Sequence, residues 1–192
     1  MNANTEASTA NYDYLQQAAA ETTDTRTALR DLMTTYGDDV WNYAFSLCRN
    51  SDMSDDITQE VFLKVYRKLG SFRGESSIKT WLLAITRHTA FDMQRSSFWK
   101  RITSSDIFTA AAVQPSAEHE AIERFSINDI WQKVMELPVK YREVLILYAH
   151  YQLSMREMAE ILKLSEGTVK SRLFHARARV LKLKERDLIE PE

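Results

Sequence analysis

Glycine and proline are scarce in this sequence: its 192 residues include four Gly and three Pro. Tight turns, β-sandwiches, barrels and Gly-rich phosphate loops all depend on these two residue types. Their scarcity, together with a hydrophobic content of 44%, favours a globular all-α protein with few tight turns. Apolar residues recur at helical spacing from Thr27 onward, which agrees with that expectation.

Two segments without helical periodicity divide the chain. Residues 1–25 are polar and predict a mobile N-terminal extension, and residues 102–114 predict a flexible linker. We therefore expect two small helical domains joined by that linker, at 26–101 and 115–186, followed by a tail at 187–192.

Within the first domain, Gly37 is expected to separate two helices or to end the first. The next helix, capped by Ser51 or Ser54, is expected to run to about Leu69. Its apolar stripe predicts burial of Ile57, Val61, Phe62, Val65, Tyr66 and Leu69. Its outer face is expected to present Asp56, Gln59, Glu60 and Lys64. A further helix is expected from Ser76 or Ser77 to about Arg95, with Phe72 and Trp81 in the core.

The formal net charge of −2 conceals two basic blocks. Residues 61–101 carry nine Lys/Arg against two Asp/Glu, and residues 151–186 carry nine against four. Each block would attract a polyanion, although a solvated helix face is the alternative reading for either block alone. The blocks therefore indicate two separate surfaces for a nucleic acid.

Several classes of function find no support in the sequence. Cys48 is the only cysteine, which excludes an intramolecular disulfide and any multi-cysteine zinc site. The four His (88, 119, 150 and 175) are scattered, and no nucleophile or phosphate-loop motif is present, so we expect no enzyme activity, metal or cofactor. No signal peptide or membrane-spanning run is apparent, which predicts a cytoplasmic protein without direct membrane insertion.

The second basic block has the layout of a helix-turn-helix. Ser154 and Glu157 form a capping box, and the turn Lys163-Leu164-Ser165 separates a short helix from a second helix over 166–177. Lys163 occupies the turn position where Gly is frequent, and a left-handed backbone there would cost about 1 kcal/mol. Such a second helix lies in the DNA major groove, where it would present Lys170, Ser171, Arg172, Arg177, Arg179 and Lys182.

Four stretches together resemble a known family. They are Asp55-Asp56-Ile57-Thr58-Gln59-Glu60-Val61-Phe62, Ser71-Phe72-Arg73-Gly74 with Thr80-Trp81-Leu82, and Glu166-Gly167-Thr168-Val169-Lys170-Ser171-Arg172. In this order they are similar to bacterial RNA polymerase sigma factors of the extracytoplasmic-function class. The resemblance implies a protein that binds core RNA polymerase and directs it to the −35 and −10 elements of promoters, with stress- or signal-responsive targets.

The resemblance also implies residue roles. The match to the segment that binds the clamp helices of the largest polymerase subunit comprises Asp56, Gln59, Glu60 and Phe62. The match to the part that binds the −10 element comprises Arg87, His88, Arg95, Phe98, Trp99, Lys100 and Arg101. The match to the −35 reader comprises Thr168, Lys170, Ser171, Arg172, His175, Arg177 and Arg179. His88 and His175 stand where some members of the family have Asn and Arg, which leaves the base preference at these two positions open.

Other readings of the sequence remain open at this point. A free-standing helix-turn-helix regulator would bind a palindrome as a dimer, and a pure interaction module would bind polymerase or an inhibitor without DNA. Beyond the clamp helices, the family resemblance names the polymerase flap and an anti-sigma factor as further partners. Two roles remain open for Phe98 and Trp99: they could stack on exposed bases or pack under the domain.

Overall fold

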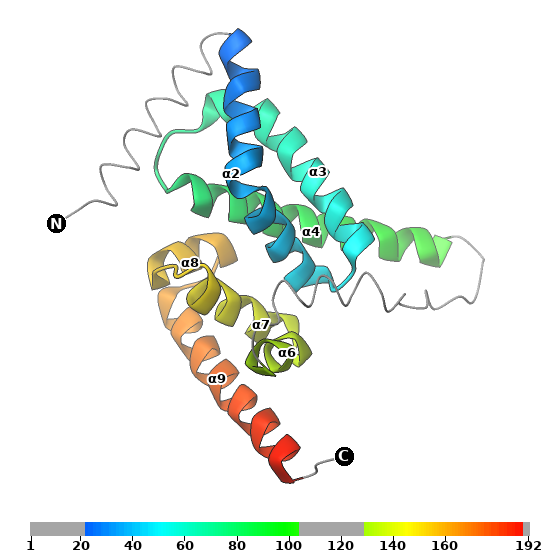
Figure 1. The fold of residues 1–192 in the computed structure, drawn as a ribbon, viewed down its shortest axis with the longest axis vertical. Coiled ribbons are helices and arrows are strands. Elements are labelled where there is room, and N and C mark those ends of the chain that lie inside the picture. Colours follow the sequence, from blue (N-terminus) through cyan, green and yellow to red (C-terminus); the bar gives the residue numbers. More distant parts are fainter. Residues whose placement is uncertain (1–21, 104–128, 190–192) are drawn as a thin grey trace, which may run out of the picture. The chain divides into compact units, whose positions relative to one another are not determined.

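The computed structural model describes residues 22–103 and 129–189, with side chains described for 25–96 and 130–186. These residues form helices and no strand (Figure 1), which confirms the all-α prediction. The predicted extension up to residue 21, the linker from 104, the start of the second domain at 115 and the tail from 190 lie outside the described residues.

The described residues group into two compact units. The first contains helix α2 (Thr22–Cys48) as far as Ala44, helix α3 (Ser51–Lys68) from Asp52 and helix α4 (Ile78–Thr103) to Lys100. The second contains the segment Phe45–Ser51 and the helices from α6 onward. Each unit buries its own set of apolar side chains, so each can be described separately.

Polar contacts join the three helices of the first unit in pairs. Trp41 Nε1 of α2 donates to Asp55 Oδ1 of α3 at 2.7 Å, and Lys79 of α4 pairs with Asp39 of α2 at 3.1 Å. Ser77 Oγ accepts the Thr80 amide at 3.1 Å and thereby caps α4, as the sequence predicts. Between them lies an apolar core that includes Val40, Tyr43, Ile57, Val61, Val65, Leu82 and Leu83.

Several expectations for the first unit are wrong. Helix α2 continues through Gly37, because a mid-helix glycine costs only about 1 kcal/mol relative to Ala and the residues on both sides pack into one core. Tyr66 is 45% exposed, since it lies one helical position beyond the buried Val65. Helix α4 also runs past Arg95 to Thr103, so residues 102 and 103 of the predicted linker are helical. Phe72 is buried, with its ring centroid 4.9 Å from that of the partly exposed Trp81.

The second unit contains α6 (Asp129–Glu136), α7 (Val139–Leu145), a π-helical turn η2 (Ile146–His150), α8 (Met155–Leu162) and α9 (Glu166–Ile189). Pro138 separates α6 from α7, as predicted, because proline disfavours helix in the residue before it. Helix α9 packs against α6, α7 and α8. The core of this unit includes Val144, Ile146, Leu147, Met158, Val169 and Ala176.

The helix-turn-helix is formed by α8 and α9, and its predicted devices are present. Ser154 Oγ accepts the Glu157 amide at 3.3 Å while Glu157 Oε2 accepts the Ser154 amide at 2.9 Å, which confirms the capping box. Lys163 ends α8 in the left-handed conformation, at φ 56°. The Leu164 amide donates to Ala159 O at 3.1 Å across this turn, so the last carbonyls of α8 are satisfied as the chain reverses.

Candidate nucleic-acid and protein interfaces

The first turn of α9 is fixed by a cap and by buried side chains. Ser165 Oγ accepts the Thr168 amide at 3.2 Å, and the two hydroxyls lie 2.9 Å apart. Val169 and Leu173 are buried in the core of the second unit. The residues on the opposite side of α9 therefore face solvent. Thr168, a predicted −35 contact, is exposed but its hydroxyl is engaged by the cap.

We define the α9 outer face as Lys170, Ser171, Phe174 and His175, which are exposed and share one side of the helix. Phe174 was not predicted as a site residue, although its spacing of four residues from Lys170 places it on the same side of the helix. It is 70% exposed, and its ring meets that of His175 edge-on with centroids 5.5 Å apart. This face combines a cation, a hydroxyl, an imidazole and an apolar ring, which are groups that read base edges and thymine methyls.

Arg172 does not share the outer face. Its Nη1 lies 3.5 Å from Oε1 of Glu143 on α7, and the side chains of Arg172 and Glu143 are 28% and 2% exposed. The adjacent Arg142 donates from Nη1 to Met135 O of α6 at 2.7 Å. Burial lowers the pKa of Arg142 to about 10, and the Glu143 carboxylate partly offsets that lowering. Two neighbouring charges of α7 therefore tie it to α6 and to α9.

Arg177 and Arg179, also predicted to bind DNA, lie over aromatic rings of neighbouring elements. The Arg177 guanidinium is 4.8 Å from the ring centroid of Tyr148 in η2, and that of Arg179 is 4.7 Å from the ring centroid of Tyr141 in α7. Cation–π contacts of this kind hold the guanidinium in place while leaving its edge accessible. Both arginines are exposed and can still contact phosphates.

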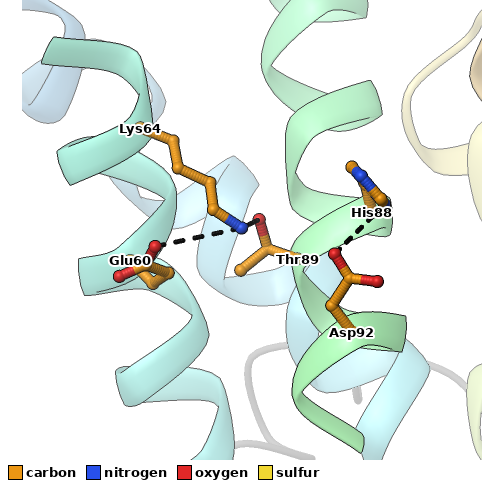
Figure 2. A network of polar contacts seen from close by, with 5 residues as sticks. All are labelled: Glu60, Lys64, His88, Thr89 and Asp92. Carbon is orange, nitrogen blue, oxygen red and sulfur yellow. Dashed lines mark hydrogen bonds and ion pairs between the residues drawn. The ribbon is translucent and has the colours of Figure 1, made fainter. Parts of the chain in front are cut away.

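The basic face of α4 is organised by contacts along the same helix. Arg87 lies over the Phe91 ring at 4.8 Å. His88 Nδ1 lies 3.4 Å from Asp92 Oδ2 one turn later (Figure 2). Arg95 follows on the same side and is exposed. The side chains of four further predicted −10 residues lie outside the described set, although their backbone belongs to α4: Phe98, Trp99, Lys100 and Arg101.

Helix α3 presents a polar face with an apolar continuation. Asp56 and Gln59 are exposed as predicted, while Glu60 is partly exposed and pairs with Lys64 at 3.9 Å. Lys64 Nζ also donates to Thr89 Oγ1 of α4 at 3.1 Å (Figure 2), so it lies between the two helices instead of on the outer face.

Two apolar residues of α3 extend its polar face, whereas a third, which was predicted to contact polymerase, is buried. Leu63 is 51% and Tyr66 is 45% exposed, on the same side of the helix as Gln59. Phe62, a predicted polymerase contact, is only 5% exposed and belongs to the core. The structure therefore gives Phe62 the role of supporting α3 from inside, while Leu63 and Tyr66 supply apolar surface that the sequence analysis did not assign.

The second unit carries an apolar groove of about 360 Å³. It is lined by residues of α6, α7, η2 and α9, among them Ile130, Trp131, Val134, Leu145, Val180 and Leu181. Ile130 and Leu181 are 49% and 61% exposed. Exposed apolar side chains around a groove are typical of a surface that binds another protein.

Among the described residues, no group of three or more His, Cys, Asp or Glu side chains could hold a metal. Burial, with a smaller contribution from the Asp39 carboxylate, raises the pKa of Tyr36 on α2. Among the described helices, none is long and apolar enough to cross a membrane.

Comparison with known proteins agrees with the two-unit division. Residues 32–100 match Sigma-70 region 2, and residues 127–180 match Sigma-70, region 4. The ECF RNA polymerase sigma factor SigM of Bacillus subtilis (strain 168) is 32% identical over 146 residues, 76% of this chain and 88% of SigM. The RNA polymerase sigma factor YlaC of the same strain is 30% identical over 159 residues, 82% of this chain and 92% of YlaC.

Solved structures show the same fold. The sigma factor RpoE from Bartonella quintana, in complex with the anti-sigma factor NepR, superposes with a TM-score of 0.66 at 25% identity, covering 82% of this chain and 97% of RpoE. CnrH, in complex with the cytosolic domain of CnrY, gives a TM-score of 0.67 at 23% identity, covering 93% of this chain and 99% of CnrH. With both regions matched and relatives aligned over most of their length, the chain belongs to the extracytoplasmic-function sigma factors of the sigma-70 family.

Proposed function

We propose that this sigma factor binds the −35 element of its promoters through the α9 outer face. The observation that carries the proposal is that the helix-turn-helix, fixed by its capping box and left-handed turn, exposes Lys170, Ser171 and His175 together. A recognition helix places such early side chains against base edges in the major groove. Thr168, Arg177 and Arg179 flank these residues and are suited to phosphate contacts.

The −10 element is bound by α4. Arg87, His88 and Arg95 form a basic, hydrogen-bonding face on one side of this helix. The helix continues into Phe98, Trp99, Lys100 and Arg101, whose residue types suit stacking on unpaired bases and binding of their phosphates. Unstacking a base costs a few kcal/mol, which such stacking and electrostatic contacts offset.

Core RNA polymerase is bound through α3 and through the apolar groove. Asp56, Gln59 and Glu60 offer acidic and polar groups to the clamp helices of the largest subunit, and Leu63 and Tyr66 add apolar area beside them. The groove of the second unit is the binding site for the polymerase flap, because its exposed Ile130 and Leu181 need an apolar partner.

The protein has no reaction of its own, and nucleotide addition belongs to the polymerase. We place its action in the cytoplasm, where bacterial core polymerase works, on a regulon that responds to stress or to another signal. The similar RpoE of Bartonella quintana was solved with an anti-sigma factor. We propose that an anti-sigma protein likewise holds this chain until its signal arrives.

Run-off transcription with bacterial core RNA polymerase and genomic fragments tests the proposal. Added protein is expected to give new, discrete start sites. Gln59→Ala with Glu60→Ala should lower both holoenzyme assembly and transcript yield, whereas Asp38→Ala, an exposed acidic control on α2, should change neither. Lys170→Gln with Ser171→Ala should leave assembly intact and lower transcription. Absence of new start sites, or a strong palindromic footprint from the protein alone, would contradict the proposal.

A further inference from the structure

The pairing of Arg172 with Glu143 separates Arg172 from the residues beside it. Lys170, Ser171 and His175 are exposed, while Arg172 points back toward α7 and is only partly exposed. Its neighbour Leu173 is buried at 4% exposure. Arg172 therefore lies on the flank of α9, where the outer face meets the packed face.

Glu143 is the more constrained partner. Its side chain is 2% exposed and lies among the buried residues Val144, Leu145 and Ile146 of α7 and η2. A carboxylate so removed from water needs cationic or hydrogen-bonding partners to remain charged. Arg172 supplies one cation and the adjacent Arg142 acts on the same carboxylate. The position of Arg172 is thus set by a buried group instead of by solvent.

The ion pair constrains how α9 is rotated about its own axis. Successive residues of an α-helix are separated by about 100° around its axis. The apolar contacts of Val169, Leu173 and Ala176 define which side of α9 packs, but apolar contacts are non-directional. An ion pair to a fixed, buried carboxylate is directional, because the guanidinium presents its donors in a rigid fork. The pair can therefore select one rotation of α9 from several with similar apolar burial.

We propose that Arg172 is a positioning residue for promoter recognition and not a DNA contact, and that its pairing with Glu143 fixes the rotation of α9 that presents the outer face to the major groove. The proposal rests on the −35 role of the outer face given above. It assigns to Glu143, which lies 29 residues away in the sequence, a part in base selectivity.

The test compares holoenzymes made with the full chain, using as probe a duplex library randomised over the upstream element. Selected and scrambled duplexes are then titrated at several salt concentrations. The variants are Lys170→Gln, Arg172→Gln, Glu143→Gln and the double variant Glu143→Gln with Arg172→Gln. Lys170→Gln is the matched control, because it removes one cation from the outer face of the same helix. Circular dichroism sets a temperature at which each variant is folded.

A cation that contacts DNA and a positioning residue give different results. Lys170→Gln should reduce the slope of log K against log salt by about one. Arg172→Gln should reduce the preference for the selected duplex about tenfold, with a much smaller change in slope. The double variant keeps the net charge of the chain, so its slope of log K against log salt should equal that of the wild type. Its preference for the selected duplex should be no lower than that of Arg172→Gln.

The double variant also decides the matter if Arg172→Gln alone leaves too little folded protein, because it does not strand the buried carboxylate. A slope lowered by about one in the double variant, as in Lys170→Gln, would overturn the proposal and restore Arg172 as a DNA contact. Additive losses from the two single changes would overturn it as well. A wild-type holoenzyme without any upstream preference would overturn both this proposal and the −35 assignment beneath it.

Discussion

The two units of this chain hold their exposed functional side chains in different ways. On α4, Arg87 and His88 are each placed by a residue one turn later in the same helix. On α9, Arg172, Arg177 and Arg179 are each placed by a residue of α7 or η2. The surface of the first unit follows from the continuity of long helices, whereas that of the second depends on the packing of one helix against its neighbours.

Helix α3 is the intermediate case. Glu60 and Lys64 pair along the helix, but Lys64 also donates to the buried Thr89 of α4. The proposed polymerase face is thus joined by one polar contact to the helix proposed to bind the −10 element. The core beneath α3 has the same supporting role that α7 has for α9.

The largest effect is expected from Phe62→Ala, which tests that supporting core. Phe62 is 5% exposed, and truncation of a buried Phe lowers the free energy of unfolding by about 3–5 kcal/mol. Leu63→Ala is the matched control, since Leu63 is its 51% exposed neighbour and should change stability by less than about 1 kcal/mol. Urea denaturation followed by circular dichroism measures both. Equally small losses of stability in the two variants would indicate that Phe62 lies at the surface and contradict its place in the core.

Removal of the capping box tests whether the helix-turn-helix depends on its local signals. Ser154→Ala deletes the acceptor of the Glu157 amide and should cost about 1–2 kcal/mol of stability. Ser96→Ala, an exposed serine of α4, should be close to neutral. Thermal unfolding of both variants gives the comparison. A Ser154→Ala protein as stable as the wild type would show that packing alone holds α8.

The left-handed turn predicts a stabilising change. Lys163 has φ 56°, where glycine has no Cβ penalty, so Lys163→Gly should raise the free energy of unfolding by about 1 kcal/mol. The exposed Lys163 side chain makes this a backbone effect. A higher Tm, with unchanged holoenzyme assembly, is the expected measurement. A lower Tm would mean that the turn adopts another conformation.

The smallest effect is expected at Gly37, in the middle of α2. A Cβ added there meets no atom within 4 Å, so Gly37→Ala should stabilise the protein by about 0.5–1 kcal/mol through helix propensity. Differential scanning calorimetry can resolve the shift in Tm. Destabilisation would indicate that Gly37 marks a break in the helix, as the sequence analysis expected.

Local signals allowed much of the second unit to be predicted. The capping box joins Ser154 to Glu157, and Lys163 ends the same short helix. Because all of these effects are local in sequence, the capping box and the turn could be deduced from spacing alone. Pro138 likewise acts on the residue before it. The all-α class followed from composition, because sparse Gly and Pro leave few tight turns of the kind that sandwiches and barrels need.

The features that could not be predicted depend on partners distant in sequence. Arg172 looked like another cation of the recognition helix, and nothing near it indicates that Glu143 holds it. Tyr66 and Phe174 lie next to the edge of an apolar stripe, and helical periodicity does not decide which side of that edge is buried. Gly37 was given too much weight as a helix breaker, since its cost is smaller than the packing gained by a continuous α2.

In the proposed function, one chain uses two separate surfaces to place polymerase on a promoter. Footprinting of the holoenzyme, combined with permanganate detection of unpaired thymines, tests it directly. We expect protection of an upstream element that weakens in the Lys170→Gln and Ser171→Ala double variant, and opening of downstream bases that weakens in the Arg87→Gln variant. Unchanged upstream protection in the first variant, unchanged opening in the second, or protection by the chain alone equal to that of the holoenzyme would contradict these roles of α9 and α4.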